Sequence, residues 1–363
     1  MKRALLVCAL LCACAPTLPA AYVRARDAAE NDYGNAQFEA AATSWLEAAQ
    51  AAGSPRDRSD ARYRAATSYE RAGQLEKARQ LYELLASGKS ERAPRATFAL
   101  ADLRLRNGDE AGGYAALEAA VRKYPTSGVA GLSLRRYFAE LAEHGGDEAV
   151  LAYIARAEPA LDQTELSEQL LYERARRLDA LGRMTEARDA YLVVADRFPY
   201  PYGAYWDDAL FHGSECEQKL GNPTRAVELL RRMLVEREAS HMSGSYERPR
   251  FADAAYRIAE LYRDGIHDPV RARRAFHDVF VDFPSSTLRD DALWQEALLA
   301  RHSSEAEACT PLSLLVKELP DSRYAPCASE ICPNLRLPVA RECKDYIRRE
   351  LEAEPDSKRE STE

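Results

Sequence analysis

The stretch GRMTEARDAYLVVADRFP, residues 182–199, shows the spacing that decides the fold of this chain. A glycine opens it, Ala187 follows five positions later, Tyr191 four positions after that, and Pro199 closes it. Between them, apolar residues recur three and four positions apart, which is the spacing of an amphipathic helix. The stretch therefore predicts a turn at Gly182 followed by one helix that ends near Pro199.

The same spacing recurs along the chain. Prolines that close similar phrases (RKYP, RAEP, DRFP, VDFP and KELP) lie 34, 40, 85 and 36 residues apart, at Pro125, Pro159, Pro199, Pro284 and Pro320. The interval of 85 holds two units and a polar insertion at residues 238–250. Matching glycine, alanine and large apolar positions are Gly73, Ala78 and Tyr82; Gly108 and Leu117; Gly221, Ala226 and Leu230; and Ala272 and Phe276.

Three units depart from this spacing. The first keeps only Ala41, Trp45 and Ala48, and another, around Gly145 and Gly146, fits loosely. The unit opened by DDALWQEALLA, residues 290–300, shows no clear second half.

Each recurring residue type has a physical reason. Glycine permits a turn between two helices, alanine lets the helices approach closely, and the large apolar residue fills the space beyond it. No long alternation of apolar and polar residues predicts a strand. We therefore expect an all-α protein built from pairs of helices.

These positions resemble the tetratricopeptide repeat, a helix-turn-helix unit of 34 residues. The resemblance implies an α-solenoid, a superhelix whose helix pairs bury one another and whose concave surface is lined by the first helix of each pair. Surfaces of this kind bind polypeptides and rarely carry out chemistry. We predict that the repeat array spans residues 22–302.

The N-terminus predicts export. Lys2 and Arg3 precede the apolar residues 4–13, which are too few for a membrane span. The sequence Leu11-Cys12-Ala13-Cys14 resembles the bacterial lipobox, so we predict a signal peptide at residues 1–13, lipid on Cys14 and a tether at residues 14–21. Because Ala15 follows the cysteine, the family rule implies the outer membrane. The alternative is a secreted soluble protein.

Charge argues against nucleic acid as a partner. The formal net charge is −8, from 50 Lys and Arg against 58 Asp and Glu, and removal of Lys2 and Arg3 makes it −10. An acidic surface of this size repels phosphate backbones. We expect the predicted lipid on Cys14 to be the membrane anchor of the chain.

Aromatic residues mark the candidate partner-binding surface. When the units are aligned, six of them carry a ring at the fifth position of the first helix: Tyr63, Phe98, Tyr172, Phe211, Tyr256 and Trp294. These rings either contact a partner or pack between neighbouring repeats, and both interpretations stay open. A second candidate is the aromatic loop, with Tyr200, Tyr202, Tyr205 and Trp206.

Four cysteines crowd the end of the array: Cys309, Cys327, Cys332 and Cys343. In an exported protein they favour disulfides, whose pairing the sequence leaves open. A zinc site lacks the paired Cys-x-x-Cys spacing, and a redox site lacks a close cysteine pair. We predict a disulfide-stapled cap at residues 303–350, a lone Cys216 in a helix, and a disordered tail at residues 351–363.

The sequence lacks the motifs of an enzyme. It contains no His-Glu-x-x-His, no Gly-x-Ser-x-Gly and no Walker phosphate loop. The acidic pairs Asp207-Asp208 and Asp290-Asp291 stand ahead of first helices, where we expect them to cap the helix N-termini. We predict no catalytic activity, no cofactor and no metal.

The phrases FPSSTLRDDALW (residues 283–294) and LPDSRYAPCA (residues 319–328), together with the lipobox, resemble BamD-type assembly lipoproteins and Tol-Pal coordinator proteins. The resemblance implies a lipid-anchored scaffold on the periplasmic face of the outer membrane, with other envelope proteins as partners. The alternatives are a coordinator linked to peptidoglycan or cell division, and a thiol-dependent accessory of an envelope enzyme.

Overall fold

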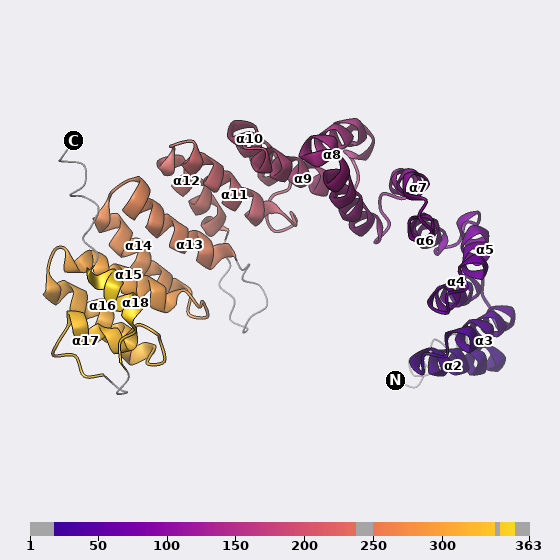
Figure 1. Cartoon of the computed structure of the whole chain (residues 1–363), viewed down its shortest axis with the longest axis horizontal. Coiled ribbons are helices and arrows are strands. Elements are labelled where there is room, and N and C mark those ends of the chain that lie inside the picture. Colours follow the sequence, from indigo (N-terminus) through magenta and orange to yellow (C-terminus); the bar gives the residue numbers. More distant parts are fainter. Residues whose placement is uncertain (1–17, 237–249, 338–341, 353–363) are drawn as a thin grey trace, which may run out of the picture. The chain divides into compact units, whose positions relative to one another are not determined.

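A computed structural model describes residues 18–236, 250–337 and 342–352. Every regular element in these ranges is a helix (Figure 1), which confirms the all-α prediction. Residues 1–167 and 168–363 form two compact units, here called unit 1 and unit 2. The predicted signal peptide, Cys14, nearly all of the insertion and the tail beyond residue 352 lie outside the described residues.

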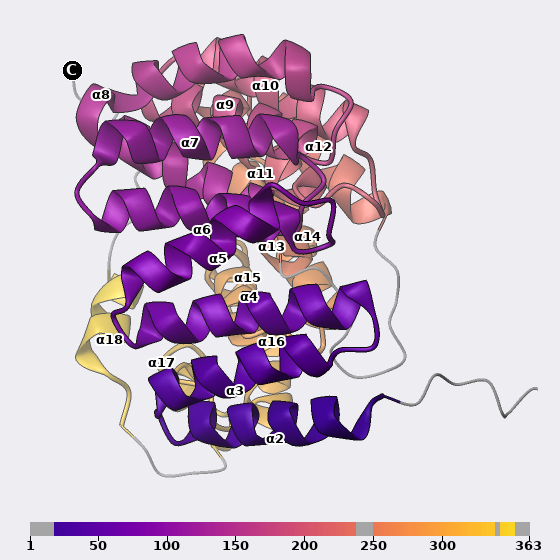
Figure 2. The same cartoon turned by 90° about the vertical axis from the view of Figure 1, so that its right-hand side faces the viewer.

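Unit 1 is a row of helix pairs. These are α2 (Ala20–Gly34) with α3 (Phe38–Ala51), α4 (Pro55–Arg71) with α5 (Leu75–Ala86), and α6 (Ala93–Arg106) with α7 (Glu110–Lys123). Each of these helices contacts the next one along the chain, as Figure 2 shows. A kink at Gly146 divides α8 (Ala130–Leu161), which thus supplies both helices of the loosely fitting unit.

Unit 2 continues the pairing. Its pairs are α9 (Ser167–Ala180) with α10 (Met184–Arg197), α11 (Trp206–Lys219) with α12 (Pro223–Val235), α13 (Arg250–Glu260) with α14 (Pro269–Asp282), and α15 (Arg289–Arg301) with α16 (Glu305–Glu318). A π-helical turn, η2 (Leu261–Gly265), extends α13. The short η3 (Ala325–Cys327), α17 (Ala328–Ile331) and α18 (Asp345–Glu352) follow.

The turn within most pairs depends on one residue in the left-handed backbone conformation. Glycine supplies it at Gly73, Gly108, Gly182 and Gly221, with φ between 72° and 81°. In the first and seventh pairs Ala36 and His267 take the same place, both at φ 57°. These two units therefore lacked the glycine signal in the sequence although they form the same turn.

In the pairs that carry the repeated spacing, the residues at its small and large positions are buried. Ala78, Ala187, Ala226 and Ala272 are fully buried, and the large residues four positions later, such as Tyr191, are at most 1% exposed. In the third pair Gly113 takes the alanine position, where a Cβ atom would lie 2.5 Å from the Leu105 side chain. The two helices of a pair thus meet at a residue with little or no side chain.

Four of the five repeating prolines end a helix as predicted. The helices α7, α10, α14 and α16 each end two residues before a proline. The prediction is wrong for Pro159, which lies inside α8. That helix continues to Leu161, whose carbonyl accepts hydrogen bonds from the backbone N–H and the hydroxyl of Thr164, at 3.0 and 2.7 Å.

The last repeat is complete, contrary to the sequence-based expectation. Its second helix is α16, which packs against α15. The sequence hid it because the turn between them lacks glycine and because Pro311 lies inside α16. The array thus reaches Glu318 rather than residue 302, and at the other end α2 begins at Ala20, within the predicted tether.

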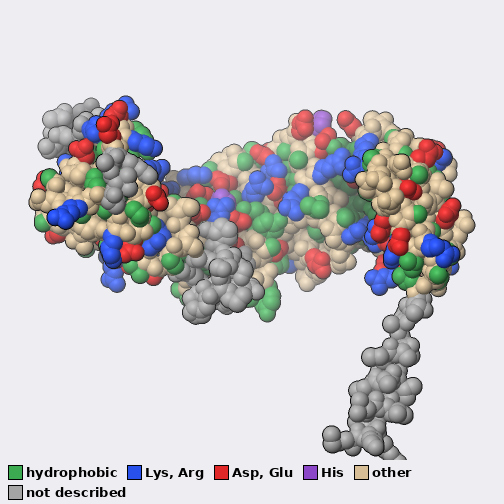
Figure 3. All heavy atoms as spheres, turned by 90° about the horizontal axis from the view of Figure 1, so that it is seen from below, with side chains coloured by type: hydrophobic (Ala, Val, Ile, Leu, Met, Phe, Trp, Pro, Cys, Tyr) green, Lys and Arg blue, Asp and Glu red, His purple; other side chains and the backbone are tan. Residues whose placement is uncertain are grey.

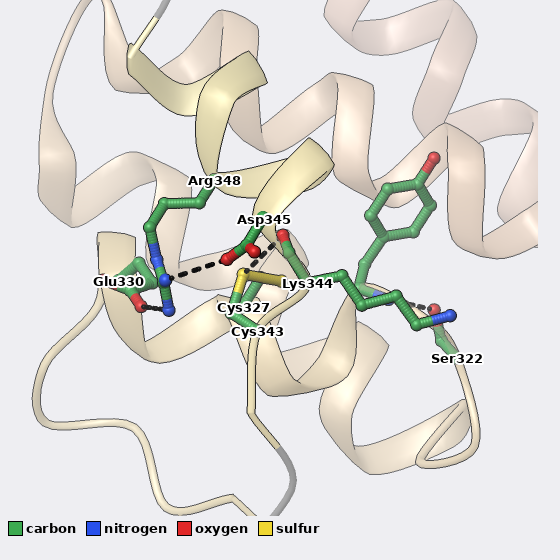
Figure 4. Close-up of a disulfide and its surroundings, with 8 residues drawn as sticks. Ser322, Cys327, Glu330, Cys343, Lys344, Asp345 and Arg348 are labelled. Atoms are coloured by element: carbon green, nitrogen blue, oxygen red, sulfur yellow. Dashed lines mark hydrogen bonds and ion pairs between the residues drawn. A yellow bond between two sulfur atoms is a disulfide. The ribbon is translucent and has the colours of Figure 1, made fainter.

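Two disulfides confirm the stapled C-terminal end. Cys309 pairs with Cys332, and Cys327 pairs with Cys343. Figure 4 shows the second bridge beside Arg348 of α18, which forms ion pairs with Glu330 at 3.2 Å and with Asp345 at 3.5 Å. Ile347 of α18 is fully buried, so this segment covers the end of the array.

We expect Gly182→Ala to lower the free energy of unfolding by about 1 kcal/mol, because an L-residue is strained in the left-handed conformation. No atom lies within 4 Å of the added Cβ, so the backbone alone causes the effect. Ala36→Gly should shift stability in the opposite direction. Urea unfolding followed by circular dichroism measures both, and equal effects of the two variants would contradict this account.

The disulfides also predict a thiol count. A chain from Ala15 to Glu363 contains five cysteines, of which Cys216 is buried and free. Burial raises the pKa of the Cys216 thiol to about 11, so it reacts slowly in the folded protein. Titration with a thiol reagent should find one thiol in denaturant and five after reduction; three in unreduced denaturant would mean that one bridge is missing.

Candidate functional site

Two pockets lie along the first helices of unit 1. One, of about 400 Å³, is lined by residues of α2, α3 and α4 and by Arg92 and Arg95 at the start of the third pair. The other, of about 520 Å³, is lined by residues of α4, α5 and α6 and by the start of α8. Tyr63, Thr67 and Arg95 line both pockets, which together are called the first-helix groove.

Apolar and aromatic side chains form much of the groove. Tyr63 is half-buried, Phe98 is 4% exposed, and Leu132 at the start of α8 is 62% exposed. Burial raises the pKa of Tyr63 and of Tyr82, so both phenols stay neutral. The Tyr82 hydroxyl donates to Glu70 at 2.9 Å.

Most charges in the groove are already paired. Asp60 binds Arg64 at 3.0 Å and also binds Arg92, and Glu70 binds Arg106 at 2.6 Å. Arg71 and Arg95 line the groove without an ion-pair partner among the described residues. They therefore remain available for an acidic group of a ligand.

The lining residues limit what this groove can do chemically. They include no histidine and no cysteine, so the groove offers no nucleophile or proton acceptor of those kinds and no imidazole or thiolate metal ligand. Hydrophobic rings beside unpaired guanidinium groups suit non-covalent binding of a polypeptide that carries apolar and acidic side chains.

The six rings at the fifth position of the first helices differ in exposure. Trp294 is fully buried and Phe98 nearly so, whereas Tyr63, Tyr172, Phe211 and Tyr256 are half-buried. Three of these rings contact a ring on the second helix of the same pair: Tyr63 with Tyr82 at 5.6 Å, Tyr172 with Tyr191 at 5.9 Å, and Tyr256 with Phe276 at 5.2 Å between centroids.

The segment that follows each repeat covers four of the rings: the next repeat covers three, and the C-terminal end beyond α16 covers Trp294. Arg92 lies over Tyr63 with Cζ 5.6 Å from the ring centroid, and Arg250 lies over Phe211 at 4.8 Å. Tyr205 stacks on Tyr172 at 4.4 Å, and Tyr324 stacks on Trp294 at 4.8 Å. These rings therefore pack between repeats, as the second interpretation of the sequence proposed.

An acidic residue holds each covering residue in place. Asp60 binds Arg92, Asp208 binds Arg250 at 2.5 Å, and Asp291 accepts from the Tyr324 hydroxyl at 2.6 Å. At the fourth junction the backbone N–H of Tyr205 donates to Glu168 at 2.7 Å. Each set of acid, ring and covering residue is called a junction clamp.

The junction clamps correct the role predicted for the acidic pairs. Asp207-Asp208 and Asp290-Asp291 do lie in the first turns of α11 and α15, where the helix dipole favours them. However, neither helix has a side-chain cap. Asp208 binds Arg250 of the next repeat, and Asp290 and Asp291 bind Ser322 and Tyr324 of the segment after α16. In the sequence, each junction clamp is marked by an acidic residue three or four positions before the ring.

The aromatic loop turns one ring outward. Trp206 is 2% exposed and Tyr200 lies 5.6 Å from it, centroid to centroid, whereas Tyr202 is 91% exposed. Gly203 fits the turn because a Cβ atom there would lie 1.9 Å from the carbonyl oxygen of Phe198. Of the four residues singled out in this loop, Tyr202 retains the exposure that a partner contact requires, and Trp206 and Tyr205 serve packing.

One group of described residues could hold a metal ion. Ligand atoms of Glu110, Glu140 and His144 lie within 4.8 Å of one another on α7 and α8. A hydrogen bond to the backbone carbonyl of Glu140, followed by the Glu140 charge, raises the pKa of His144. The shift favours protonation of the imidazole, which pairs with Glu140 at 3.2 Å and competes with metal binding.

The clamps predict opposite effects for two aromatic substitutions. Trp294→Ala should lower local stability by about 3–5 kcal/mol, because it removes a fully buried ring from a repeat junction. Tyr202→Ala should change stability by less than about 0.5 kcal/mol. Hydrogen exchange of α15 and α16 reports the first change directly, and unaltered protection in Trp294→Ala would contradict the packing role.

Positive and negative side chains alternate over the visible surface of the molecule. Figure 3 shows Lys and Arg side chains interspersed with Asp and Glu side chains over the face that it presents. No broad basic surface is visible on this face, which agrees with the acidic composition of the sequence.

One family model supports the assignment of a repeat in this chain. A tetratricopeptide repeat family model matches residues 60–87, and no curated protein matches the chain. The C-terminal part of a tetratricopeptide repeat-containing protein from Cytophaga hutchinsonii is similar at 13% identity, with a TM-score of 0.42, over 73% of this chain and 98% of that one. A tetratricopeptide repeat protein from Parabacteroides merdae is similar at 11% identity, with a TM-score of 0.33, over 76% and 98%.

The matched residues 60–87 span α4 from Asp60 onward and the whole of α5. The same pairing of helices continues through both units. Residues 60–87 are thus a tetratricopeptide repeat, and the helix pairs before and after them give the chain the tetratricopeptide-repeat fold.

Proposed function

We propose that this chain is a protein-interaction scaffold that binds a partner polypeptide in the first-helix groove of unit 1. The observation that carries the proposal is the pair of pockets that share Tyr63, Thr67 and Arg95 along successive first helices. Apolar side chains there provide contact area, and Arg71 and Arg95 select for an acidic residue in the partner.

The proposed location is the periplasmic face of the outer membrane, where lipid on Cys14 anchors the chain and other envelope proteins are its partners. The lipobox resemblance of residues 11–14 supports this location. Several acyl chains would make release from the bilayer negligible, since each buried methylene contributes roughly 0.8 kcal/mol. Among the described residues, no helix has the length and apolar character that a membrane span needs.

The closed disulfides favour the scaffold over a thiol-dependent accessory. Both C-terminal pairs are oxidised, and the free Cys216 is fully buried with a raised pKa. A thiol that exchanges with other proteins needs exposure and a lowered pKa. Assembly of outer-membrane proteins is the envelope process that we propose for the scaffold.

Site-specific photo-crosslinking in cells tests the proposal. A crosslinking residue at Leu132, on the groove, should give discrete adducts with an envelope protein, identified by mass spectrometry. The matched control is Leu84 on α5, which is 51% exposed and lies outside both pockets. Arg71→Gln with Arg95→Gln should reduce the Leu132 adduct several-fold, and Cys14→Ala should move the chain to the soluble fraction.

Two outcomes would overturn the proposal. Equal adducts from Leu132 and Leu84 would mean that the groove is not the contact surface. If the chain stays in the membrane fraction after Cys14→Ala, lipid on Cys14 is not its membrane anchor. This result does not bear on the groove, which the Leu132 and Leu84 adducts test separately.

A further inference from the structure

Unit 2 contains a pocket of about 560 Å³ that shares no lining residue with the first-helix groove. It is lined by residues of α12 and α14, the second helices of two neighbouring repeats, and by residues of α13 and η2. Leu234, Ile258, Ala275 and Phe283 give it apolar walls. The same two second helices expose Val235, Val270 and Val281, with 80%, 77% and 56% of their surface accessible.

One side chain of the pocket lining comes from an irregular helical turn. The π-helical turn Leu261–Gly265 places Tyr262 in the pocket lining. The turn ends where the N–H of Ile266 donates to Leu261 at 2.9 Å and the N–H of Asp268 donates to Tyr262 at 2.7 Å. π-Turns inside α-helices are rare and occur frequently at functional sites.

Guanidinium groups from both neighbouring repeats meet at Tyr262. Cζ of Arg231, on α12, lies 5.8 Å from the ring centroid, and Cζ of Arg271, on α14, lies 5.6 Å from it. Arg271 also pairs with Asp268 at 3.1 Å. Arg231 and Arg274 line the pocket without an ion pair to any described residue.

Two carboxylates limit the kind of anion that this pocket suits. Asp278 and Asp282 also line the pocket; burial together with the charge of Asp282 raises the pKa of Asp278, and the charge of Arg274 opposes this shift. A phosphate with up to two negative charges would be repelled by them, whereas a single carboxylate beside the arginines is less affected. The apolar walls require an apolar side chain next to that carboxylate.

We propose that this pocket is a second docking site, which takes a segment of a partner polypeptide that carries an Asp or Glu next to a Leu, Ile or Phe. The carboxylate binds Arg231 and Arg274 beside the Tyr262 ring, and the apolar side chain packs on Leu234 and Ile258. This site is separate from the first-helix groove, so the scaffold holds two polypeptide segments at the same time.

The test uses a phage-displayed library of random dodecapeptides, selected on the chain from Ala15 to Glu363. Binding of each enriched peptide is then measured by fluorescence anisotropy on Arg231→Gln with Arg274→Gln, and on two controls. The first control is Arg225→Gln, which is also on α12 but is 71% exposed at its side chain and outside the pocket. The second is the groove variant Arg71→Gln with Arg95→Gln.

We expect at least one enriched peptide with an acidic residue beside an apolar one. Its affinity should fall at least tenfold on Arg231→Gln with Arg274→Gln and when its acid is replaced by the amide, and less than twofold on both controls. If no enriched peptide behaves in this way, the second docking site is overturned. Peptides that lose affinity only on the groove variant would overturn this site while supporting the first-helix groove.

Discussion

The close contact of two helices at one small residue is the constraint on which the rest of this structure depends. Ala78, Ala187, Ala226 and Ala272 are fully buried where the helices of their pairs meet. A larger side chain at these positions would separate the helices and open the interior of the pair. A pair held this way still leaves one side uncovered, which the following pair must bury.

The junctions between pairs show how that burial is made specific. At four places an acid, a ring and a residue that follows the repeat form a junction clamp, for example Asp208, Phe211 and Arg250. Each clamp covers the ring and holds the covering residue by a hydrogen bond or an ion pair, so it fixes the register of one repeat on the segment that follows. It also removes most of the ring from the surface that a partner could reach.

The partner binding that we propose depends on the residues whose charge or apolar surface the clamps do not cover. In unit 1 these are Arg71, Arg95 and Leu132 along the first helices. In unit 2 they are Arg231 and Arg274, which line one pocket with Tyr262. Both surfaces combine guanidinium groups that lack an ion pair with apolar walls, which is why we propose that each recognises an acidic segment although the chain is acidic overall.

The sequence by itself determined the helix pairs, the turns at Gly73, Gly108, Gly182 and Gly221, and the stapling of the C-terminal end, because backbone conformation, small-residue spacing and cysteine clustering are local properties. It missed the turns at Ala36 and His267 and the helix α16, where packing overrides weak local preference. Only the tertiary structure decided which rings are covered, which cysteines pair and which arginines lack a partner. The rings are covered by residues about 30 to 40 positions away, and the cysteines pair across 23 and 16 positions, so no local pattern records how these residues meet.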